Sequence, residues 1–260
     1  MSEPTGCSRR DRVVAMRLAA ALLPVALMAG GCSGQDAAPG AVADSPLRFE
    51  ARPRAGAKPC APGEYELRVA AGRRALMRVT PPATARPRAV LVALHGAGSG
   101  GAPGGLYAFR GAWTVPGLVI VAPAAAGSAW TLEATDVRFV DRALQRAFAR
   151  CRINQRRVAV GGFSSGAGMA LWLGLSNGDL FHGLIALSGG GALPDARVGK
   201  PSVFVAHGTL DDVIPAERGG DAVVRELRDE GYDVTYRRFR GGHRVLPAIA
   251  RAAVVSTLMR

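Results

Sequence analysis

Lysine is almost absent from this chain, although the chain is strongly basic. Of its 33 basic residues only Lys58 and Lys200 are lysines, and the formal net charge is +13. A basic chain can bind nucleic acid or an anionic membrane surface. Here the arginines are scattered beside alanine, glycine and proline, and aromatic residues, at 6% of the chain, do not alternate with them. No nucleic-acid module is recognisable, so we expect no nucleic-acid partner.

The chain also has little that could cross a membrane. An apolar run from Leu18 to Met28 is too short to span a bilayer stably. It follows a basic head and ends in small residues before Cys32, which is the form of a secretory signal. Cys32 resembles the lipidated cysteine of a bacterial lipobox, and ordinary signal cleavage is the alternative. We expect residues 1–32 to be a signal segment, and the protein to be exported as a cell-envelope lipoprotein or in a secreted or periplasmic form.

The stretch after this segment shows no hydrophobic periodicity. Residues 33–59 are rich in alanine, proline, glycine and aspartate, a composition typical of a flexible linker. We expect a single folded domain over residues 60–260, a length that suits one α/β domain with a large core.

Only two of the four cysteines, Cys60 and Cys151, follow the signal segment. An even number in an oxidising compartment favours a disulfide between them, and two free buried thiols are the alternative. Neither has a cysteine or histidine neighbour at the spacing of a metal site. We expect no metal and no organic cofactor.

Strand-like and helix-like segments alternate along the rest of the chain. An antiparallel hairpin is predicted first, and the later strands are short apolar runs that end in glycine-rich turns. The expected strands are 64–70, 75–80, 88–94, 118–121, 157–161, 183–187, 203–206 and 232–239. The expected helices are 106–113, 132–150, 167–175, 217–230 and 245–259. This order predicts a mainly parallel sheet with an antiparallel N-terminal edge, helices on both faces, and a site at the carboxyl ends of the strands. Residues 188–202 are too few to form a lid domain.

The most informative stretch runs from Val158 to Met169. An apolar strand ends in Gly162-Phe-Ser164-Ser-Gly166 and passes directly into a helix-like segment. This is the pattern of a nucleophile elbow, in which the positions two before and two after the serine must be nearly free of side chain. Ser165 cannot be the central residue, because its flanks would be Phe163 and Ala167. The pattern predicts Ser164 as a nucleophile, with an ordinary glycine-rich turn as the alternative.

A serine nucleophile needs a base and a group that orients the base. The chain has four histidines, and His243 follows the last strand and two glycines, where a loop could place an imidazole over the sheet edge. We select His243 as the base. The acid is expected between serine and histidine, and Asp211 follows a buried strand. Its neighbour Asp212 is the alternative.

The transition state also needs hydrogen-bond donors for the developing oxyanion. We expect the backbone N–H groups of Ser165 and of Ala97, in the loop after the strand that ends at Leu94, to supply them. Trp130 is the best candidate for an aromatic wall against the substrate, although core packing is the commoner use of such a residue.

These pieces together resemble the α/β-hydrolase family. The matching stretches are Leu94 to Gly98, Asp136 to Phe139, Arg157 to Gly166, His207 to Asp211 and Gly241 to His243. More narrowly, the chain is similar to the polyhydroxybutyrate depolymerases and the feruloyl and acetylxylan esterases, with the carboxylesterase/phospholipase group close behind. The resemblance implies serine ester hydrolysis through an acyl-enzyme intermediate, on a small-molecule or polymer ester, and does not fix the acyl group.

Two other functions fit the same sequence. One is a serine peptidase of the same fold, although the chain lacks the propeller or lid that often selects peptides. The other is a non-catalytic binding lipoprotein that keeps the scaffold. An intact set of Ser164, Asp211 and His243 favours the enzyme.

Overall fold

The computed structural model describes residues 48–70, 72–82, 86–191 and 193–259. All of them lie in one compact unit, Pro39–Arg260. The predicted signal segment, Cys32 and the first part of the predicted linker lie outside the described residues. Within the described part of the chain, no helix is long and apolar enough to cross a membrane.

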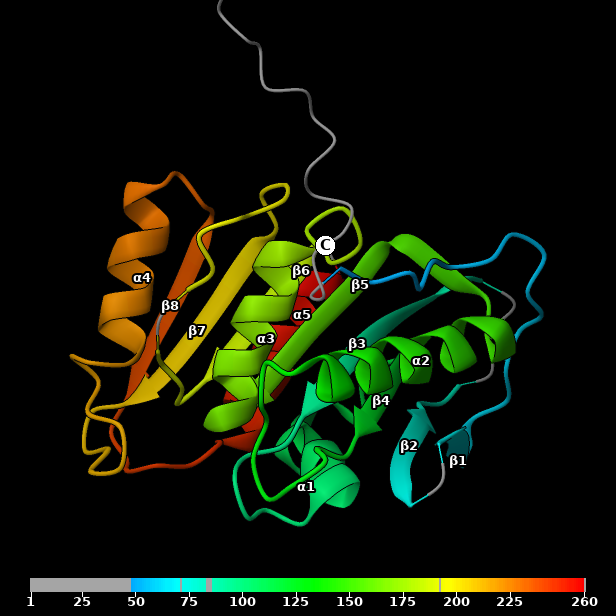
Figure 1. Cartoon of the computed structure of the whole chain (residues 1–260), viewed down its shortest axis with the longest axis horizontal. Coiled ribbons are helices and arrows are strands. Elements are labelled where there is room, and N and C mark those ends of the chain that lie inside the picture. The colour runs from blue at the N-terminus through cyan, green and yellow to red at the C-terminus, as the bar shows by residue number, and fades with distance from the viewer. Residues whose placement is uncertain (1–47, 71, 83–85, 192, 260) are drawn as a thin grey trace, which may run out of the picture. The chain divides into compact units, whose positions relative to one another are not determined.

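The strands of the described residues form a single sheet in the order β1-β2-β4-β3-β5-β6-β7-β8 (Figure 1). They are β1 (Gly63–Ala70), β2 (Arg73–Val79), β3 (Arg88–Leu94), β4 (Leu118–Pro123), β5 (Ile153–Phe163), β6 (Gly183–Leu187), β7 (Ser202–Gly208) and β8 (Val234–Phe239). Strand β2 is antiparallel to both β1 and β4, and every other pair is parallel. The structure therefore confirms the predicted fold class, a mainly parallel sheet with an antiparallel N-terminal edge.

Both faces of the sheet are covered by helices, which explains why the central strands are apolar throughout. In β3, Val90 and Val92 point into one core, and Leu91 and Ala93 point into the other. The helices are α1 (Gly101–Ala108), α2 (Ala134–Arg150), α3 (Ser165–Ser176), α4 (Gly220–Asp229) and α5 (Pro247–Leu258), with a 3-10 turn η1 (Arg110–Ala112). Helices α2, α3 and α4 supply the first core, and α1, η1 and α5 supply the second (Figure 1). Successive side chains of a strand point to opposite faces, so both sets must be apolar.

The first helix lies earlier in the chain than its sequence suggests. We expected a helix over residues 106–113, but α1 ends at Ala108 and only the short 3-10 turn follows it. Glycine-rich sequence normally disfavours helix. Here a side chain at Gly105 would meet the Ala93 carbonyl oxygen at 2.5 Å, so close packing against β3 requires the glycine. Tertiary contact outweighs helix propensity in this segment.

The predicted linker also differs from the structure at its C-terminal end. Phe49 and Ala51 are buried in the first core, and the Phe49 ring lies 5.5 Å from that of Phe181. Two buried side chains accept the backbone N–H groups of this segment, Asn177 for Phe49 and Asp141 for Ala51, each at 2.8 Å. The folded domain therefore begins before the predicted residue 60, because polar partners from two helices satisfy the segment's backbone.

Cys60 and Cys151 form a disulfide that ties this N-terminal segment to the end of α2. Their sequence separation is 91 residues. A backbone hydrogen bond from Arg152 N to Lys58 O, 2.9 Å long, lies beside it. The predicted pairing is therefore present in the structure.

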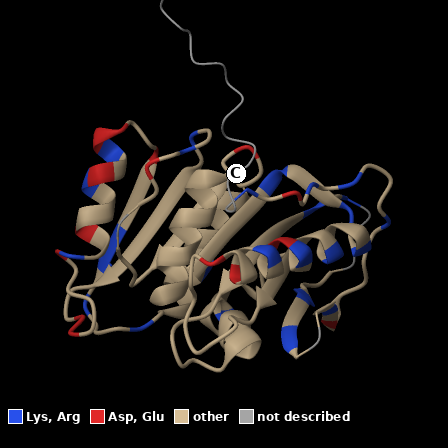
Figure 2. Ribbon diagram, viewed as in Figure 1, with Lys and Arg blue, Asp and Glu red and all other residues tan. Residues whose placement is uncertain are grey.

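Figure 2 shows the charged residues on the described elements. Lysines and arginines are spread over several helices and strands, and acidic residues lie among them on α4. Among the described residues, seven arginines of the strands and loops are paired with carboxylates: Arg48, Arg52, Arg73, Arg74, Arg78, Arg197 and Arg238. The positive charge thus forms no single basic stripe along the described part of the chain.

Candidate active site

The turn between β5 and α3 holds Ser164 in a backbone conformation that few side chains adopt. Its φ is 54° and its ψ is −121°. Such a conformation costs about 1–3 kcal/mol and persists only where the surroundings enforce it. The Ser164 N–H donates to the Leu187 carbonyl at the end of β6, with an N···O distance of 3.0 Å. The neighbouring strand thus helps to fix the strained turn.

The glycines on either side of Ser164 are required by close backbone approach. A Cβ atom at Gly162 would lie 2.2 Å from the Gly166 carbonyl oxygen, and one at Gly166 would lie 2.4 Å from the His95 carbonyl oxygen. Neither contact is possible for a real side chain. The sequence pattern therefore has the steric meaning that was expected for a nucleophile elbow.

The structure brings Ser164, His243 and Asp211 into one chain of hydrogen bonds. His243 Nε2 lies 2.9 Å from Ser164 Oγ, and His243 Nδ1 lies 2.8 Å from Asp211 Oδ2. A proton on Nδ1 donates to the carboxylate and leaves Nε2 free to accept from the serine hydroxyl. The Phe163 ring, with its centroid 4.8 Å from that of the imidazole, packs against His243.

Asp211 is held by backbone donors as well as by His243. Its Oδ1 accepts from the N–H groups of Val213 at 3.1 Å and Ile214 at 2.9 Å. Burial raises the pKa of Asp211, but the Ile214 N–H and the neighbouring imidazoles outweigh burial and lower the pKa below its ordinary value. Asp211 therefore stays ionised. Asp212, the alternative acid, is exposed.

A second imidazole faces the same carboxylate oxygen. His207 is fully buried, and its Nδ1 accepts the Gly220 N–H at 3.1 Å. The proton must then be on Nε2, which lies 2.8 Å from the Ile214 carbonyl oxygen and 3.3 Å from Asp211 Oδ2. His207 received no role when His243 was selected as the base from the sequence. Its position near the end of β7, four residues before Asp211, was the available signal.

The loop after β3 lies against the nucleophile, as the expected oxyanion loop should. A Cβ atom at Gly96 would be 3.4 Å from the Ser164 Cβ. Among the described residues, no backbone carbonyl accepts the N–H of Ala97 or of Ser165. The loop itself is fixed by a Gly98 N–H···O bond to Ser128, 2.8 Å long, and by Ser99 Oγ donating to the Gly96 carbonyl at 2.7 Å. Neither predicted donor is thus used in a backbone hydrogen bond within the described part of the chain.

Trp130 does not line the substrate side of this site, contrary to our expectation. It is buried, with 9% of its surface exposed, and its Nε1–H donates to the His95 carbonyl at 2.9 Å. The His95 ring packs beside the indole, with 4.9 Å between the ring centroids. A buried tryptophan needs a hydrogen-bond acceptor for its N–H, and here the acceptor is the His95 carbonyl in the loop after β3. Trp130 therefore helps to hold this loop in place.

The side chain of His95 also holds the loop after β3 in place through two hydrogen bonds. Its Nε2 accepts the Ala125 N–H at 3.0 Å, so Nδ1 carries the proton and donates to the Gly96 carbonyl at 2.8 Å. Burial lowers the pKa of His95 below its ordinary value. A neutral imidazole therefore links the loops that follow β3 and β4.

A cavity of about 340 Å³ opens beside His243. Its aromatic walls are Tyr107 from α1 and Phe163 from the elbow, and two arginines, Arg110 and Arg244, also line it. Phe163 was missed because it sits inside the elbow pattern, where only the glycines and serine drew attention. Tyr107, on α1, forms the other aromatic wall of this cavity.

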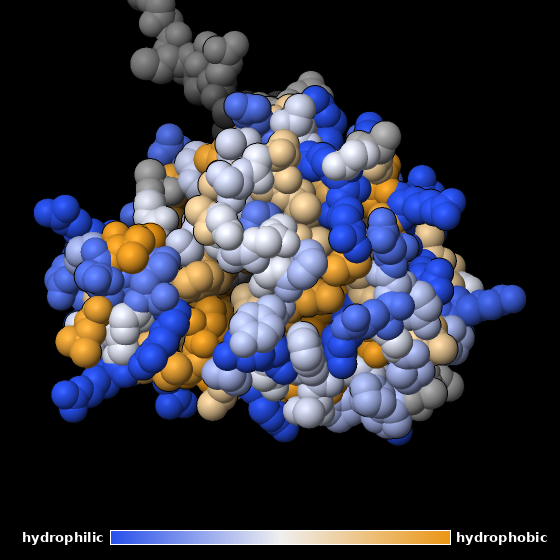
Figure 3. Space-filling model, turned by 90° about the horizontal axis from the view of Figure 1, so that it is seen from below, coloured by the Kyte–Doolittle hydropathy of each residue, from blue (hydrophilic) through white to orange (hydrophobic). Residues whose placement is uncertain are grey.

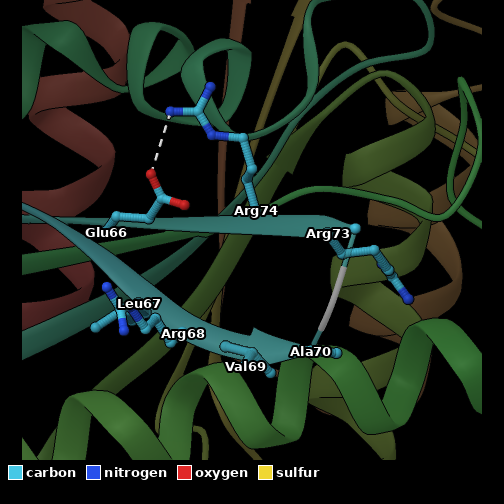
Figure 4. Close-up of a pocket in the computed structure, with 8 residues that line it drawn as sticks. Glu66, Leu67, Arg68, Val69, Ala70, Arg73 and Arg74 are labelled. Atoms are coloured by element: carbon cyan, nitrogen blue, oxygen red, sulfur yellow. Dashed lines mark hydrogen bonds and ion pairs between the residues drawn. The ribbon is translucent and has the colours of Figure 1, made fainter.

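A larger cavity of about 550 Å³ lies elsewhere, in the β1–β2 hairpin (Figure 4). Figure 4 shows Arg74 and Glu66, two of its lining residues, joined by an ion pair with an N···O distance of 3.5 Å. Its lining holds no serine, cysteine or histidine. Size alone therefore does not mark the reactive cavity of this protein.

The sheet order, the strained serine at the end of β5 and the histidine after β8 define the α/β-hydrolase fold. The chain has this fold. Residues 134–251 match the model of the phospholipase/carboxylesterase family. The sequence resembles two groups of esterases, and this match is to the carboxylesterase/phospholipase group.

Part of the chain is also similar in sequence to curated proteins named acyl-protein thioesterase 1. An acyl-protein thioesterase 1 of Gibberella zeae is 34% identical over 101 residues, which are 35% of this chain and 43% of that protein. Another from Emericella nidulans is 32% identical over 99 residues, covering 34% of this chain and 41% of its own. The chain thus matches less than half the length of these curated relatives.

Solved structures share the fold over a longer span. Esterase PE8 superposes with a TM-score of 0.57 at 24% identity, over 69% of this chain and 95% of that protein. A phospholipase/carboxylesterase from Dyadobacter fermentans has a TM-score of 0.56 at 21% identity, over 73% of this chain and 97% of its own. The family match, the relatives and the fold together support a place among the esterase and thioesterase hydrolases.

Proposed function

We propose that this protein is a serine hydrolase that cleaves carboxylic esters, or thioesters, through an acyl-enzyme intermediate. The observation that carries the proposal is the hydrogen-bonded chain from Ser164 through His243 to Asp211, which starts at a strained elbow beside the two predicted backbone donors. Thioesters are included because the curated relatives are named acyl-protein thioesterases.

The first half of the reaction acylates Ser164. Its Oγ attacks the substrate carbonyl carbon while its proton passes to His243 Nε2. The carbonyl oxygen becomes an oxyanion beside the N–H groups of Ala97 and Ser165. Asp211 keeps the proton on Nδ1 and stabilises the imidazolium charge. When the tetrahedral intermediate collapses, Nε2 gives its proton to the departing alcohol or thiol.

The second half releases the acid. A water molecule gives its proton to His243 Nε2 and attacks the acyl carbon, and the same two backbone N–H groups again hold the oxyanion. The bond to Ser164 Oγ then breaks, and the proton returns from Nε2 to Oγ. Each step uses only side chains and backbone of this chain, so the reaction needs no cofactor.

Hydrolysis of p-nitrophenyl acetate, butyrate and octanoate by the purified chain tests the proposal. Ser164→Ala should lose nearly all activity, since removing a triad member typically costs a factor of about 10⁴ or more in kcat. Ser165→Ala is the matched control, because it keeps the backbone N–H and changes only a neighbouring hydroxyl. Mass spectrometry of the rapidly quenched reaction should find the acyl group on the peptide that contains Ser164.

The same experiment separates the alternatives. If the folded chain and Ser164→Ala are equally inert on every ester and thioester, the esterase proposal fails and a non-catalytic binding lipoprotein or a serine peptidase takes its place. Cleavage that survives in Ser164→Ala would assign the activity to another group.

We propose further that the protein is exported and held at the membrane by a lipid on Cys32. The basic head, the apolar run from Leu18 to Met28 and the small residues before Cys32 support this proposal, and the Cys60–Cys151 disulfide suits an oxidising compartment. Expression in a Gram-negative host tests it. The wild type should stay with the membrane fraction and Cys32→Ser should not. Recovery of both in the cytoplasm would refute export.

A further inference from the structure

The cavity beside His243 combines an apolar floor with positive charge. Ala108 and Val245 join the two aromatic walls, Tyr107 and Phe163, as its apolar lining. Tyr107 is unusually exposed for a large aromatic side chain, with 59% of its surface accessible. Figure 3 views the molecule from below and shows apolar patches among hydrophilic residues on the face seen there. An exposed aromatic wall next to a reactive imidazole is a typical substrate surface.

The guanidinium groups of two arginines, Arg110 and Arg244, belong to the residues that line the same cavity. Arg110 stacks on the Tyr107 ring, with its Cζ 4.1 Å from the ring centroid, and donates to the Tyr107 carbonyl at 3.2 Å. Arg244 directly follows His243 and lines the same cavity. The cavity lining thus carries two cations, one from η1 and one from the loop that contains His243.

No carboxylate of the described residues neutralises these two cations. The described ion pairs of this domain engage arginines elsewhere, and none includes Arg110 or Arg244. The cavity lining also contains no aspartate or glutamate. A guanidinium has five N–H donors in a fixed fork that matches a carboxylate, and Arg110 uses one of them in a described bond. Most of the donors in this cavity are therefore available to a ligand.

We propose that the ester cleaved at Ser164 carries a carboxylate, and that Arg110 and Arg244 bind this carboxylate while Tyr107 and Phe163 contact the carbon chain between it and the scissile bond. The inference rests on the proposed esterase function. It names the substrate class of the same site, an anionic monoester, and makes Arg110 and Arg244 the residues that select it. A purely apolar acyl pocket would not place two uncompensated cations next to the reacting atoms.

Two pairs of esters test this inference. The first pair places the charge on the acid side: the p-nitrophenyl monoester of glutaric acid against p-nitrophenyl methyl glutarate. The second places it on the alcohol side: 4-acetoxybenzoate against methyl 4-acetoxybenzoate. Within each pair the carboxylate is replaced by its neutral methyl ester. The quantity to compare is the anionic-to-neutral ratio of kcat/KM, after the rate without enzyme is subtracted.

We expect the anionic member of at least one pair to be preferred by the wild type. In Arg110→Gln and Arg244→Gln that preference should fall by about tenfold or more, because a charge-assisted hydrogen bond usually contributes at least such a factor. Arg225→Gln is the matched control. Arg225 is an exposed residue of α4 without a described ion pair, so it removes the same net charge away from the cavity and should leave the ratio unchanged.

The outcomes separate this inference from the proposed function. If the neutral esters are cleaved through Ser164 but the ratio stays near one and neither arginine variant changes it, the carboxylate specificity is wrong and the esterase stands. An equal fall of the ratio in Arg225→Gln would show a general effect of net charge and would also refute it. If no member of either pair is cleaved, the proposed function fails and this inference fails with it.

Discussion

His207 Nε2 lies 3.3 Å from Asp211 Oδ2, the same oxygen that His243 Nδ1 approaches to 2.8 Å. Asp211 therefore faces two imidazoles through one oxygen, while its other oxygen receives two backbone N–H groups. A carboxylate with this many donors is restricted to one orientation. His207 is in this sense a positioning residue for the proposed triad.

Replacing His207 should weaken the reaction without touching the substrate. We expect His207→Phe to lower kcat by about tenfold or more with little change in KM, because lost orientation of a reacting pair lowers kcat. His207→Gln should retain more activity, since its amide can still donate to the Ile214 carbonyl and keep an N–H near Asp211. Circular dichroism and thermal unfolding provide the control for folding. Equal kcat values in the folded Phe and wild-type proteins would refute the positioning role.

The buried His95 makes a prediction about acid stability. Burial lowers its pKa in the folded chain below the value of about 6.5 that an unfolded chain would have. As the pH falls through that value, the unfolded chain binds a proton that the native imidazole resists, so the free energy of unfolding decreases. The contribution is fully present above the unfolded pKa and is lost progressively below it.

Urea unfolding at a series of pH values between 8 and 5 measures this effect. His95→Gln cannot titrate, so its free energy of unfolding should fall less steeply than that of the wild type over the same range. The variant should be less stable than the wild type at pH 8, because it loses the hydrogen bonds to Ala125 and Gly96. Parallel pH curves for the two proteins would contradict the assignment.

The elbow glycines offer a steric prediction. Gly162→Ala would place a Cβ atom 2.2 Å from the Gly166 carbonyl oxygen. We expect a loss of about 2 kcal/mol or more in unfolding free energy, together with loss of activity, since the strained turn cannot relax without moving Ser164. Gly127→Ala is the matched control, because no atom lies within 4 Å of its added Cβ. A fully active Gly162→Ala enzyme would show that the turn is more adaptable than its geometry indicates.

The disulfide provides a prediction about global stability. Cys60→Ser with Cys151→Ser opens a loop with a sequence separation of 91 residues. The chain-entropy model assigns about 4–5 kcal/mol to closing a loop of this length. We expect the double variant to unfold at clearly lower urea concentration than the oxidised wild type, and the wild type in reducing agent to behave like the variant. Equal midpoints would show that the bridge contributes no net stability.

The sequence predicted those features that depend on local pattern. Two strands, Arg88 to Leu94 and Gly183 to Leu187, match the structure at both ends, because a strand buried on both faces must be apolar at every position. The elbow at Ser164 was predictable because this turn requires glycine two residues before and two residues after the serine. The order of Ser164, Asp211 and His243 along the chain identified partners that are far apart in sequence, since the carboxyl ends of parallel strands meet at one edge.

Other features depend on contacts that no local pattern reports. The sequence suggested that Trp130 lines the substrate cavity. In the structure its indole is buried and its N–H donates to the His95 carbonyl. Phe49 and Ala51 lie in a stretch with the composition of a linker. Their backbone N–H groups are accepted by Asn177 and Asp141, which are 128 and 90 residues further along the chain.

The amino-acid sequence by itself thus determined the alternation of strands and helices, the strained serine turn and the chemical types of the reacting side chains. Steric demand and hydrophobic periodicity act over a few neighbouring residues and are visible in any single sequence. The tertiary structure decided that Asp211 Oδ2 lies near two imidazoles. It also decided that the rings of Tyr107 and Phe163 line the cavity. In addition, it decided that Arg110 and Arg244 line one cavity with His243, whose lining contains no carboxylate. Those relationships join segments that are distant in the chain, and only the folded backbone brings them within a few ångströms of one another.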